Sequence, residues 1–291
     1  MSRNDDRLGL DHVPQDDGAT AAVASTTEQN TATAPAFNWS VPTEFVELPS
    51  EGTFYPPGHP LHNERTIEIR FMTAKEEDIL TSRSLLKEGV ALDRMLQNLI
   101  IDKRVDVNTL LVGDKNALLV AARRTGYGPE YETNITCPNC STNVEYSFDI
   151  SSPPVIDFRG NADKLMVTYS SHGTVNITLP MTRAQVECRL LTGADETRVA
   201  KEALRKSKKK MDSTSTTDAF RAFITSVNGD NNPFTVESFI QAMPARDARH
   251  LRTIYAQVIP NINLKQEFDC SNCGHEADME VPLGVDFFWP K

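Results

Sequence analysis

The sequence predicts an α+β protein made of two related, mainly helical halves that are joined through a β element. Segments with helical periodicity alternate with short stretches of alternating polarity. A Cys-x-x-Cys pair also recurs late in each half, at Cys137 and Cys140 and again at Cys270 and Cys273. With 291 residues, 39% hydrophobic and 24% charged, the composition is that of a soluble globular protein with one large or two ordinary domains.

Three regions follow from the changes in composition along the chain. Residues 1–40 are polar with almost no large apolar side chains, so we expect a disordered N-terminal arm. Residues 41–150 are predicted to form the first half, which ends with one cysteine pair. Residues 151–291 are predicted to form the second half, with the other pair and a Lys-rich insertion near 201–217.

The first half begins with an extended, ordered segment over 45–58, where Pro and Gly exclude a regular helix. Alternation from Thr66 predicts a strand, and Thr73-x-x-Glu76 predicts a capping box that starts a helix. The remaining expected elements are a helix through Leu92, Leu96, Leu99 and Ile100, a helix through Leu118, Leu119 and Ala122 that ends at Gly126, and strands at 131–136 and 144–150.

The second half repeats several of these landmarks in the same order. Thr174–Leu179 alternates as a strand, and Met181-Thr182-x-x-Gln185 resembles the first capping box at a spacing of 109 residues (182 minus 73). The other expected correspondences are Val236–Ile240 with Val107–Leu111, Asp247 with Asp114, and Cys270 with Cys137, the last two at 133 residues (270 minus 137). A helical face is expected at Phe220, Phe223, Ile224 and Val227.

Internal duplication explains these landmarks if the Lys-rich insertion supplies the extra residues of the second copy. The alternative is coincidental recurrence of common helix signals, since the two strands fall one residue out of phase at the 109-residue spacing.

The four paired cysteines are the strongest chemical signal. Tetrahedral zinc takes four ligands, and each half supplies only two thiolates. We therefore expect Cys137, Cys140, Cys270 and Cys273 to hold one structural zinc per chain in a zinc-ribbon-like β element. Free buried thiols are the alternative. A dithiol redox role is disfavoured because neither pair precedes a helical pattern.

The two other residues near this chemistry have simpler interpretations. His275 could replace a zinc ligand, although a surface histidine is expected. Cys188 follows the second box on an expected helix face and is predicted to be a small core residue.

Charge and motifs exclude several classes of function. The net charge of −10, from 30 basic and 40 acidic residues, repels a phosphate backbone. The basic run Lys201–Lys210 is interpreted as a solvated helix end, and a zinc-containing nucleic-acid-binding regulatory protein is the alternative function. No membrane span, secretory signal or common catalytic motif is found in the sequence, so neither an enzyme nor a small-molecule substrate is expected.

An ordered set of segments resembles the T4-type phage baseplate hub family: Leu48–Pro56, Met72–Leu85, Val107–Leu119, Thr125–Tyr131 and Cys137–Cys140. The resemblance covers about a third of the chain closely, and the second half more loosely. It implies a non-enzymatic hub subunit, or a hub assembly factor, of a contractile tail baseplate.

The same resemblance implies other phage tail baseplate or hub proteins as partners. It also implies a place in the virion tail, and in the host cytoplasm during assembly. Candidate apolar contact surfaces are Phe54-Tyr55 and Phe287–Trp289, which could equally pack on their own domain.

Overall fold

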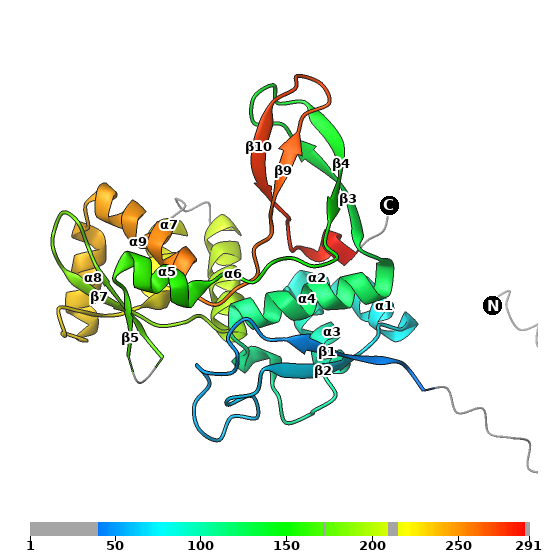
Figure 1. Ribbon diagram of the computed structural model, residues 1–291, viewed down its shortest axis with the longest axis horizontal. Coiled ribbons are helices and arrows are strands. Elements are labelled where there is room, and N and C mark those ends of the chain that lie inside the picture. The colour runs from blue at the N-terminus through cyan, green and yellow to red at the C-terminus, as the bar shows by residue number, and fades with distance from the viewer. Residues whose placement is uncertain (1–39, 171–172, 209–214, 289–291) are drawn as a thin grey trace, which may run out of the picture. The chain divides into compact units, whose positions relative to one another are not determined.

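A two-stranded sheet is the first element among the described residues (Figure 1). The computed structural model describes residues 40–170, 173–208 and 215–288. The predicted arm therefore lies outside the described residues except for Ser40, as do Trp289 and the middle of the Lys-rich insertion. The helices and strands belong to one compact unit that starts at Val41.

The first sheet pairs β1 (Thr43–Glu47) with β2 (Thr66–Arg70) in antiparallel register. Val46, Ile67 and Ile69 are buried on the face toward the helices, so the alternating sequence has one apolar side, as a half-buried strand requires. The segment after β1 turns from Pro49 onward, so only part of the expected extended segment is strand.

Five helical elements follow this sheet. They are α1 (Ala74–Thr81), α2 (Arg83–Glu88), α3 (Ala91–Leu99), η2 (Val107–Thr109) and α4 (Val112–Tyr127). The predicted capping box is confirmed at the start of α1, where the Thr73 amide donates to the Glu76 carboxylate at 3.0 Å. The predicted end at Gly126 is two residues early, because Gly128 caps α4 and its amide donates to Arg124 O.

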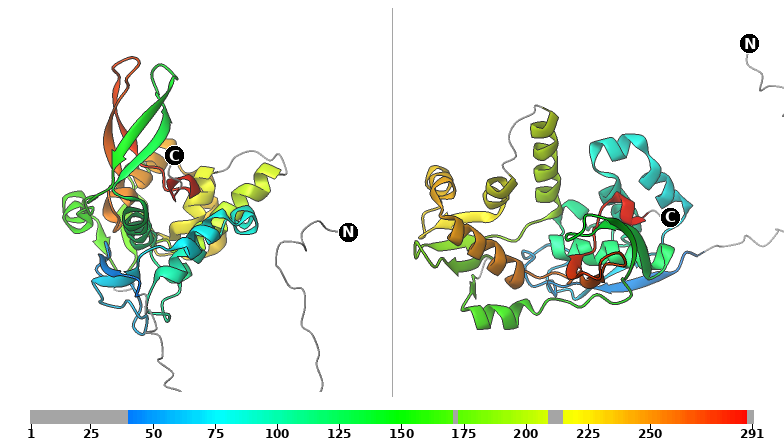
Figure 2. Two further views of the ribbon diagram at one scale, coloured as in Figure 1. Left: turned by 90° about the vertical axis from the view of Figure 1, so that its right-hand side faces the viewer. Right: turned by 90° about the horizontal axis from the view of Figure 1, so that it is seen from above.

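Two β-hairpins stand side by side beyond α4 (Figures 1 and 2). They are β3 (Glu130–Thr136) with β4 (Asn143–Asp149) and β9 (Lys265–Asp269) with β10 (Glu276–Glu280). Side chains join the hairpins, because the Tyr146 hydroxyl donates to Glu267 O at 2.7 Å and its ring contacts Phe268 edge-on. Hairpins from distant parts of the sequence thus form one β element.

The remaining strands form a four-stranded antiparallel sheet in the order β5-β6-β7-β8. They are β5 (Thr168–Tyr169), β6 (Val175–Thr178), β7 (Gln185–Cys188) and β8 (Ile224–Val227). The remaining helices are α5 (Phe158–Leu165), α6 (Gly193–Lys208), α7 (Ser215–Phe223), α8 (Pro233–Ala242), α9 (Ala245–Val258) and, packed near α4, η3 (Val285–Phe288). The mixture of helices and strands confirms the α+β class.

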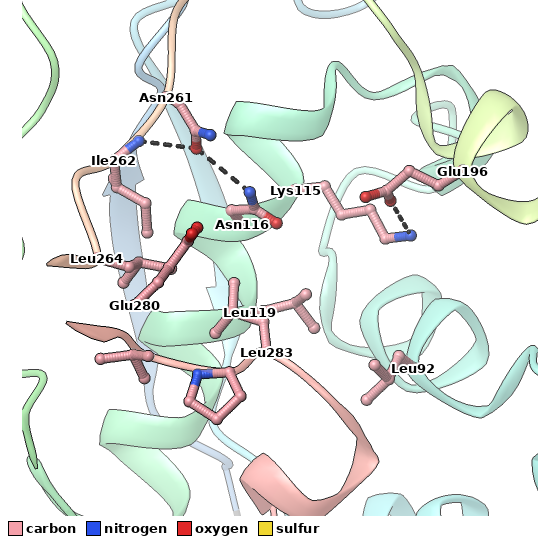
Figure 3. Close-up of a pocket in the computed structure, with 12 residues that line it drawn as sticks. Leu92, Lys115, Asn116, Leu119, Glu196, Asn261, Ile262, Leu264, Glu280 and Leu283 are labelled. Atoms are coloured by element: carbon pink, nitrogen blue, oxygen red, sulfur yellow. Dashed lines mark hydrogen bonds and ion pairs between the residues drawn. The ribbon is translucent and has the colours of Figure 1, made fainter. Parts of the chain in front are cut away.

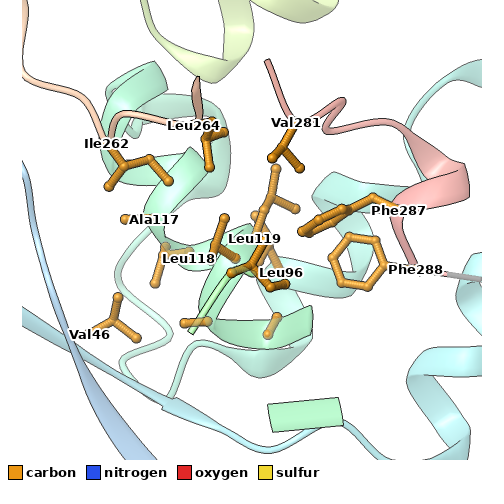
Figure 4. Close-up of a cluster of buried hydrophobic side chains, with 14 of the residues drawn as sticks. Val46, Leu96, Ala117, Leu118, Leu119, Ile262, Leu264, Val281, Phe287 and Phe288 are labelled. Atoms are coloured by element: carbon orange, nitrogen blue, oxygen red, sulfur yellow. The ribbon is translucent and has the colours of Figure 1, made fainter. Parts of the chain in front are cut away.

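The buried apolar side chains form two clusters. One contains residues of the four-stranded sheet and of the helices packed on it, between Ala162 and Val258. The other surrounds α4 and also takes in Ile262, Leu264, Val281, Phe287 and Phe288 from the end of the chain (Figure 4). The last segment of the sequence therefore completes the core around α4.

Both expected apolar contact segments pack on their own domain. Tyr55 is 3% exposed, and Phe287 and Phe288 are at most 1% exposed. The Phe287 ring packs edge-on against Tyr131. Within the described residues, these aromatics belong to the core and do not form an open contact surface.

The second predicted capping box is wrong. Met181 and Thr182 lie in a turn, and Gln185 begins β7 rather than a helix. The reason is a tertiary contact, because the Asp247 carboxylate accepts from the amides of Met181 and Thr182 at 2.8 and 2.9 Å. Cys188 is fully buried as predicted, but in a strand.

The helical face predicted through Phe220 and Phe223 is also partly wrong. The helix α7 ends at Phe223, and Ile224 and Val227 belong to β8. β8 pairs with β7, and its residues Ile-Thr-Ser-Val include the β-branched types that favour strands.

Candidate metal centre

Each cysteine pair lies in the tight turn at the tip of one hairpin. In the first turn, the Cys137 amide donates to Thr142 O and the Ser141 amide donates to Cys137 O, both at 2.9 Å. In the second, the Cys270 amide donates to His275 O at 3.0 Å and the Gly274 amide donates to Cys270 O at 2.8 Å. The same backbone pattern thus aims two thiols from each hairpin.

A left-handed residue closes each of these turns. Ser141 has φ of 56° and Gly274 has φ of 64°. This conformation suits glycine and is disfavoured for serine. Both residues follow the second cysteine of their pair directly, so the two turns share one backbone conformation.

The four sulfur atoms converge on one point. Cys137 Sγ lies 3.8 Å from Cys273 Sγ, and Cys140 Sγ lies 3.8 Å from Cys270 Sγ. All four sulfurs lie within 4.8 Å of one another. A tetrahedron with metal–sulfur bonds of about 2.3 Å has sulfur–sulfur edges of about 3.8 Å. The cluster therefore has the dimensions of a tetrathiolate site and could hold a metal ion.

Two asparagines cross between the hairpins. Asn139 Nδ2 donates to Cys273 Sγ at 3.7 Å, and Asn272 Nδ2 donates to Cys140 Sγ at 3.6 Å. Each asparagine thus supports a thiol of the opposite pair, as partners outside a metal's ligand set commonly do. The sequence analysis assigned these asparagines no role, and their matching positions within Cys-x-Asn-Cys were the available signal.

Burial and hydrogen bonding differ among the four thiols. Cys137 and Cys270 are buried, Cys140 is half-buried and Cys273 is exposed. Hydrogen bonds lower the pKa of Cys140 from 9.0 to about 5, and the bond with the Thr142 side chain contributes most, the bond from Asn272 next. The thiolate, which is the form that binds metal, is therefore favoured at this position.

The other predicted residues near this chemistry lie elsewhere. His275 contributes its carbonyl to the second turn and is not among the clustered ligand atoms. Cys188 belongs to the buried cluster of the four-stranded sheet. Within the described part of the Lys-rich run, Lys201 to Lys208 lie on α6, where Lys206 pairs with Asp218 of α7.

A cavity of about 410 Å³ lies between α4, α6 and the segment after β10 (Figure 3). Lys115 in its wall is 8% exposed and pairs with Asp93 at 2.6 Å and Glu196 at 3.0 Å. The cation is therefore already neutralised by α3 and α6. Its role in the fold is to join three helices.

In this α+β protein, two hairpins from distant parts of the chain thus meet at four clustered cysteines. In the parts of the chain that the structure describes, no helix has both the length and the apolar character needed to cross a membrane.

Residues 42–289 match the model of the family described as T4 bacteriophage base plate protein. The chain belongs to this family and is a structural protein of a phage baseplate. No curated protein and no solved structure matches it.

Proposed function

We propose that this protein is a non-enzymatic structural or assembly component of the central hub of a contractile phage tail baseplate. The family match carries the proposal, because baseplate proteins act by binding other tail proteins. The ordered segments from Leu48 to Cys140 that resemble hub proteins support the finer assignment to the hub.

Zinc bound by Cys137, Cys140, Cys270 and Cys273 is the second part of the proposal. The sulfur–sulfur distances support it, since they suit zinc–thiolate bonds without rearrangement. A bound ion would cross-link two hairpins that lie 133 residues apart in sequence (270 minus 137). Its binding free energy would stabilise the folded state, because the unfolded chain has no preformed site.

The third part of the proposal is that the two halves arose by internal duplication. In support, β1 and β6 are both followed by Leu-Pro, at Leu48 and Leu179. The turn after each strand donates to an aspartate near the start of a long helix. Asp114 accepts from the Ser50 amide at 2.9 Å, and Asp247 accepts from the Met181 amide at 2.8 Å.

An arginine–acid pair recurs one strand later. Arg70 pairs with Glu76 at 2.6 Å, and Arg189 pairs with Asp195 at 2.6 Å. The counterpart of Thr73 is then Thr192, whose amide donates to Asp195 at 3.1 Å. The spacing between the two halves at this point is then 119 residues (192 minus 73) instead of 109. With this spacing, the first residue of β2, Thr66, corresponds to the first residue of β7, Gln185.

Metal content tests the zinc assignment. We expect one zinc per chain by elemental mass spectrometry of protein purified without added metal, and loss of that zinc in Cys137→Ser and Cys270→Ser. Cys188→Ala is the matched control and should retain the metal, because Cys188 lies outside the cluster. Half a zinc per chain would indicate a site between two molecules, and none would refute the assignment.

Composition of the virus particle tests the hub role. We expect the protein in purified tails or in hub intermediates by mass spectrometry, with negative-stain imaging to identify each species. Presence only in intermediates would favour an assembly factor. Absence from both would refute both forms of the hub proposal and leave the zinc assignment standing.

A further inference from the structure

One edge of the first sheet has no partner among the described residues. The sheet contains only β1 and β2, and the outer edge of β2 is covered by a bridge between Ile69 and Ile100. On the far edge of β1, no described strand is paired. A row of free amides and carbonyls on such an edge can pair with another extended chain.

The register identifies which backbone groups face outward. Leu48 N donates to Arg65 O and Phe71 N donates to Pro42 O, both at 2.8 Å. Because hydrogen-bonded pairs alternate along an antiparallel ladder, the even-numbered residues of β1 bond to β2. The amides and carbonyls of Thr43, Phe45 and Glu47 therefore point away from β2.

In the four-stranded sheet, another strand covers the corresponding edge. β6 pairs with β7 as β1 pairs with β2, but β6 also pairs with β5 on its other side. Tyr169 of β5 fixes this strand to α9 and α5, because its hydroxyl donates to Val258 O at 2.7 Å and lies 3.1 Å from Phe158 O. Beside β1, the described residues provide no strand in the corresponding position.

A groove of about 290 Å³ runs beside β1 in this place. Its floor includes the small apolar residues Ala117, Val120 and Ala121 of α4, which lies over β1 (Figure 1). Phe45 and Val155, which also line it, are 69% and 48% exposed. Ser152 and Pro153, which precede Val155 in sequence, belong to the lining as well.

We propose that this groove, bounded by β1 and residues 152–155, binds one extended segment of a partner polypeptide as an antiparallel strand on β1. The alanines of α4 select small or medium apolar side chains at alternate positions, because these point toward the groove floor. Arg124 in the groove lining already pairs with Glu44, so among the described lining residues the carboxylate of Glu47 sets the charge of the groove. Basic residues flanking the apolar positions therefore match the charge of the edge.

A direct test uses a short synthetic peptide of alternating valine and threonine with a lysine at each end. We expect the peptide to slow amide hydrogen exchange at Phe45 and Glu47 by at least about tenfold, whereas Glu44 and Val46 are already protected by β2. No slowing at Phe45 and Glu47 with peptide at about 1 mM, the weak end of specific binding, would overturn the proposal.

Phe45→Pro is the informative variant. Proline removes the outward amide of position 45 and leaves the ladder to β2 intact, because residue 45 does not bond to β2. We expect peptide affinity to fall by about tenfold or more, while Phe45→Thr, which keeps the amide, loses less than about threefold. Circular dichroism and zinc content report whether each variant folds.

Two further outcomes would contradict the proposal. Equal affinity for Phe45→Pro and wild type would show that binding does not use the β1 backbone. Concentration-dependent protection of Phe45 and Glu47 without peptide, together with a dimer in analytical ultracentrifugation, would assign the edge to a second copy of the chain.

Discussion

At the scale of single residues, two arginine–acid pairs connect strands to the helices that follow them. Glu76 is fully buried and accepts from both terminal nitrogens of Arg70 and from Thr73. Asp195 makes the same kind of contacts with Arg189 and Thr192. Each carboxylate thus caps its own helix and holds the end of the preceding strand.

These pairs predict how stability depends on pH. Burial alone would raise the pKa of Glu76, but hydrogen bonds from Arg70 and Thr73 outweigh it and hold the pKa below 4.5. Bonds from Arg189 and Thr192 likewise hold the pKa of Asp195 below 3.8 against burial. The stabilisation is complete above these ordinary values and is lost as the pH falls through them toward the lowered values.

Glu76→Gln should remove part of this dependence. Loss of the charge facing the partly buried Arg70 is expected to cost about 2–4 kcal/mol of unfolding free energy at neutral pH and less at pH of about 3. Urea unfolding across this pH range would measure it, with exposed Glu88→Gln as the control. A cost that stays constant with pH would contradict the ion-pair account.

At the same scale, sequence reasoning identified some of these residues but not others. Thr73 and Glu76 were predicted from their spacing, whereas Arg70 was not, because it lies outside the four-residue box although it is only six residues from Glu76. The box at Thr182 failed for a different reason, since Asp247 takes its amides from 65 residues away. Local patterns carry no information about such distant acceptors.

At the scale of elements, the two hairpin turns combine one geometry with different residues. Ser141 and Gly274 both adopt the left-handed conformation. The strands around the first turn were predictable, because residues 131–136 and 144–150 lie close to the observed β3 and β4. Convergence of all four sulfurs was predicted from ligand count alone, and the sulfur positions agree with it.

Gly274→Ala should destabilise the protein. A Cβ at Gly274 would meet no atom within 4 Å, so the cost is that of the left-handed backbone alone, about 1–2 kcal/mol. Ser141→Gly should be tolerated or slightly stabilising, because glycine relieves the same conformation. Chemical unfolding of the metal-loaded variants would compare them, and equal losses would contradict this reasoning.

At the scale of the whole described unit, the core around α4 depends on the end of the chain. Arg123 is 3% exposed and donates to Phe287 O at 2.8 Å, and it also donates to Gly128 O and Glu130 O. One side chain thereby joins α4, the start of β3 and η3. Periodicity predicted α4 as a helix, but it could not show that residues after Val258 return to pack on it.

Arg123→Met should loosen this end of the molecule. Three carbonyl oxygens lose their donor, so we expect a loss of about 2–4 kcal/mol, with faster amide exchange in residues 284–288. The neighbouring Arg124→Met is the control and should cost less than about 1 kcal/mol, since Arg124 is 37% exposed. Unchanged exchange in residues 284–288 would refute this role.

The position of Phe287 and Phe288 in the core around α4 has a consequence for synthesis. Domains generally fold from the N-terminus as the chain leaves the ribosome. Here Leu118 and Leu119 emerge long before Phe287 and Phe288, which belong to the same buried cluster (Figure 4). The helices of the first half therefore stay incompletely packed, and accessible to chaperones or proteases, until Phe287 and Phe288 have been synthesised.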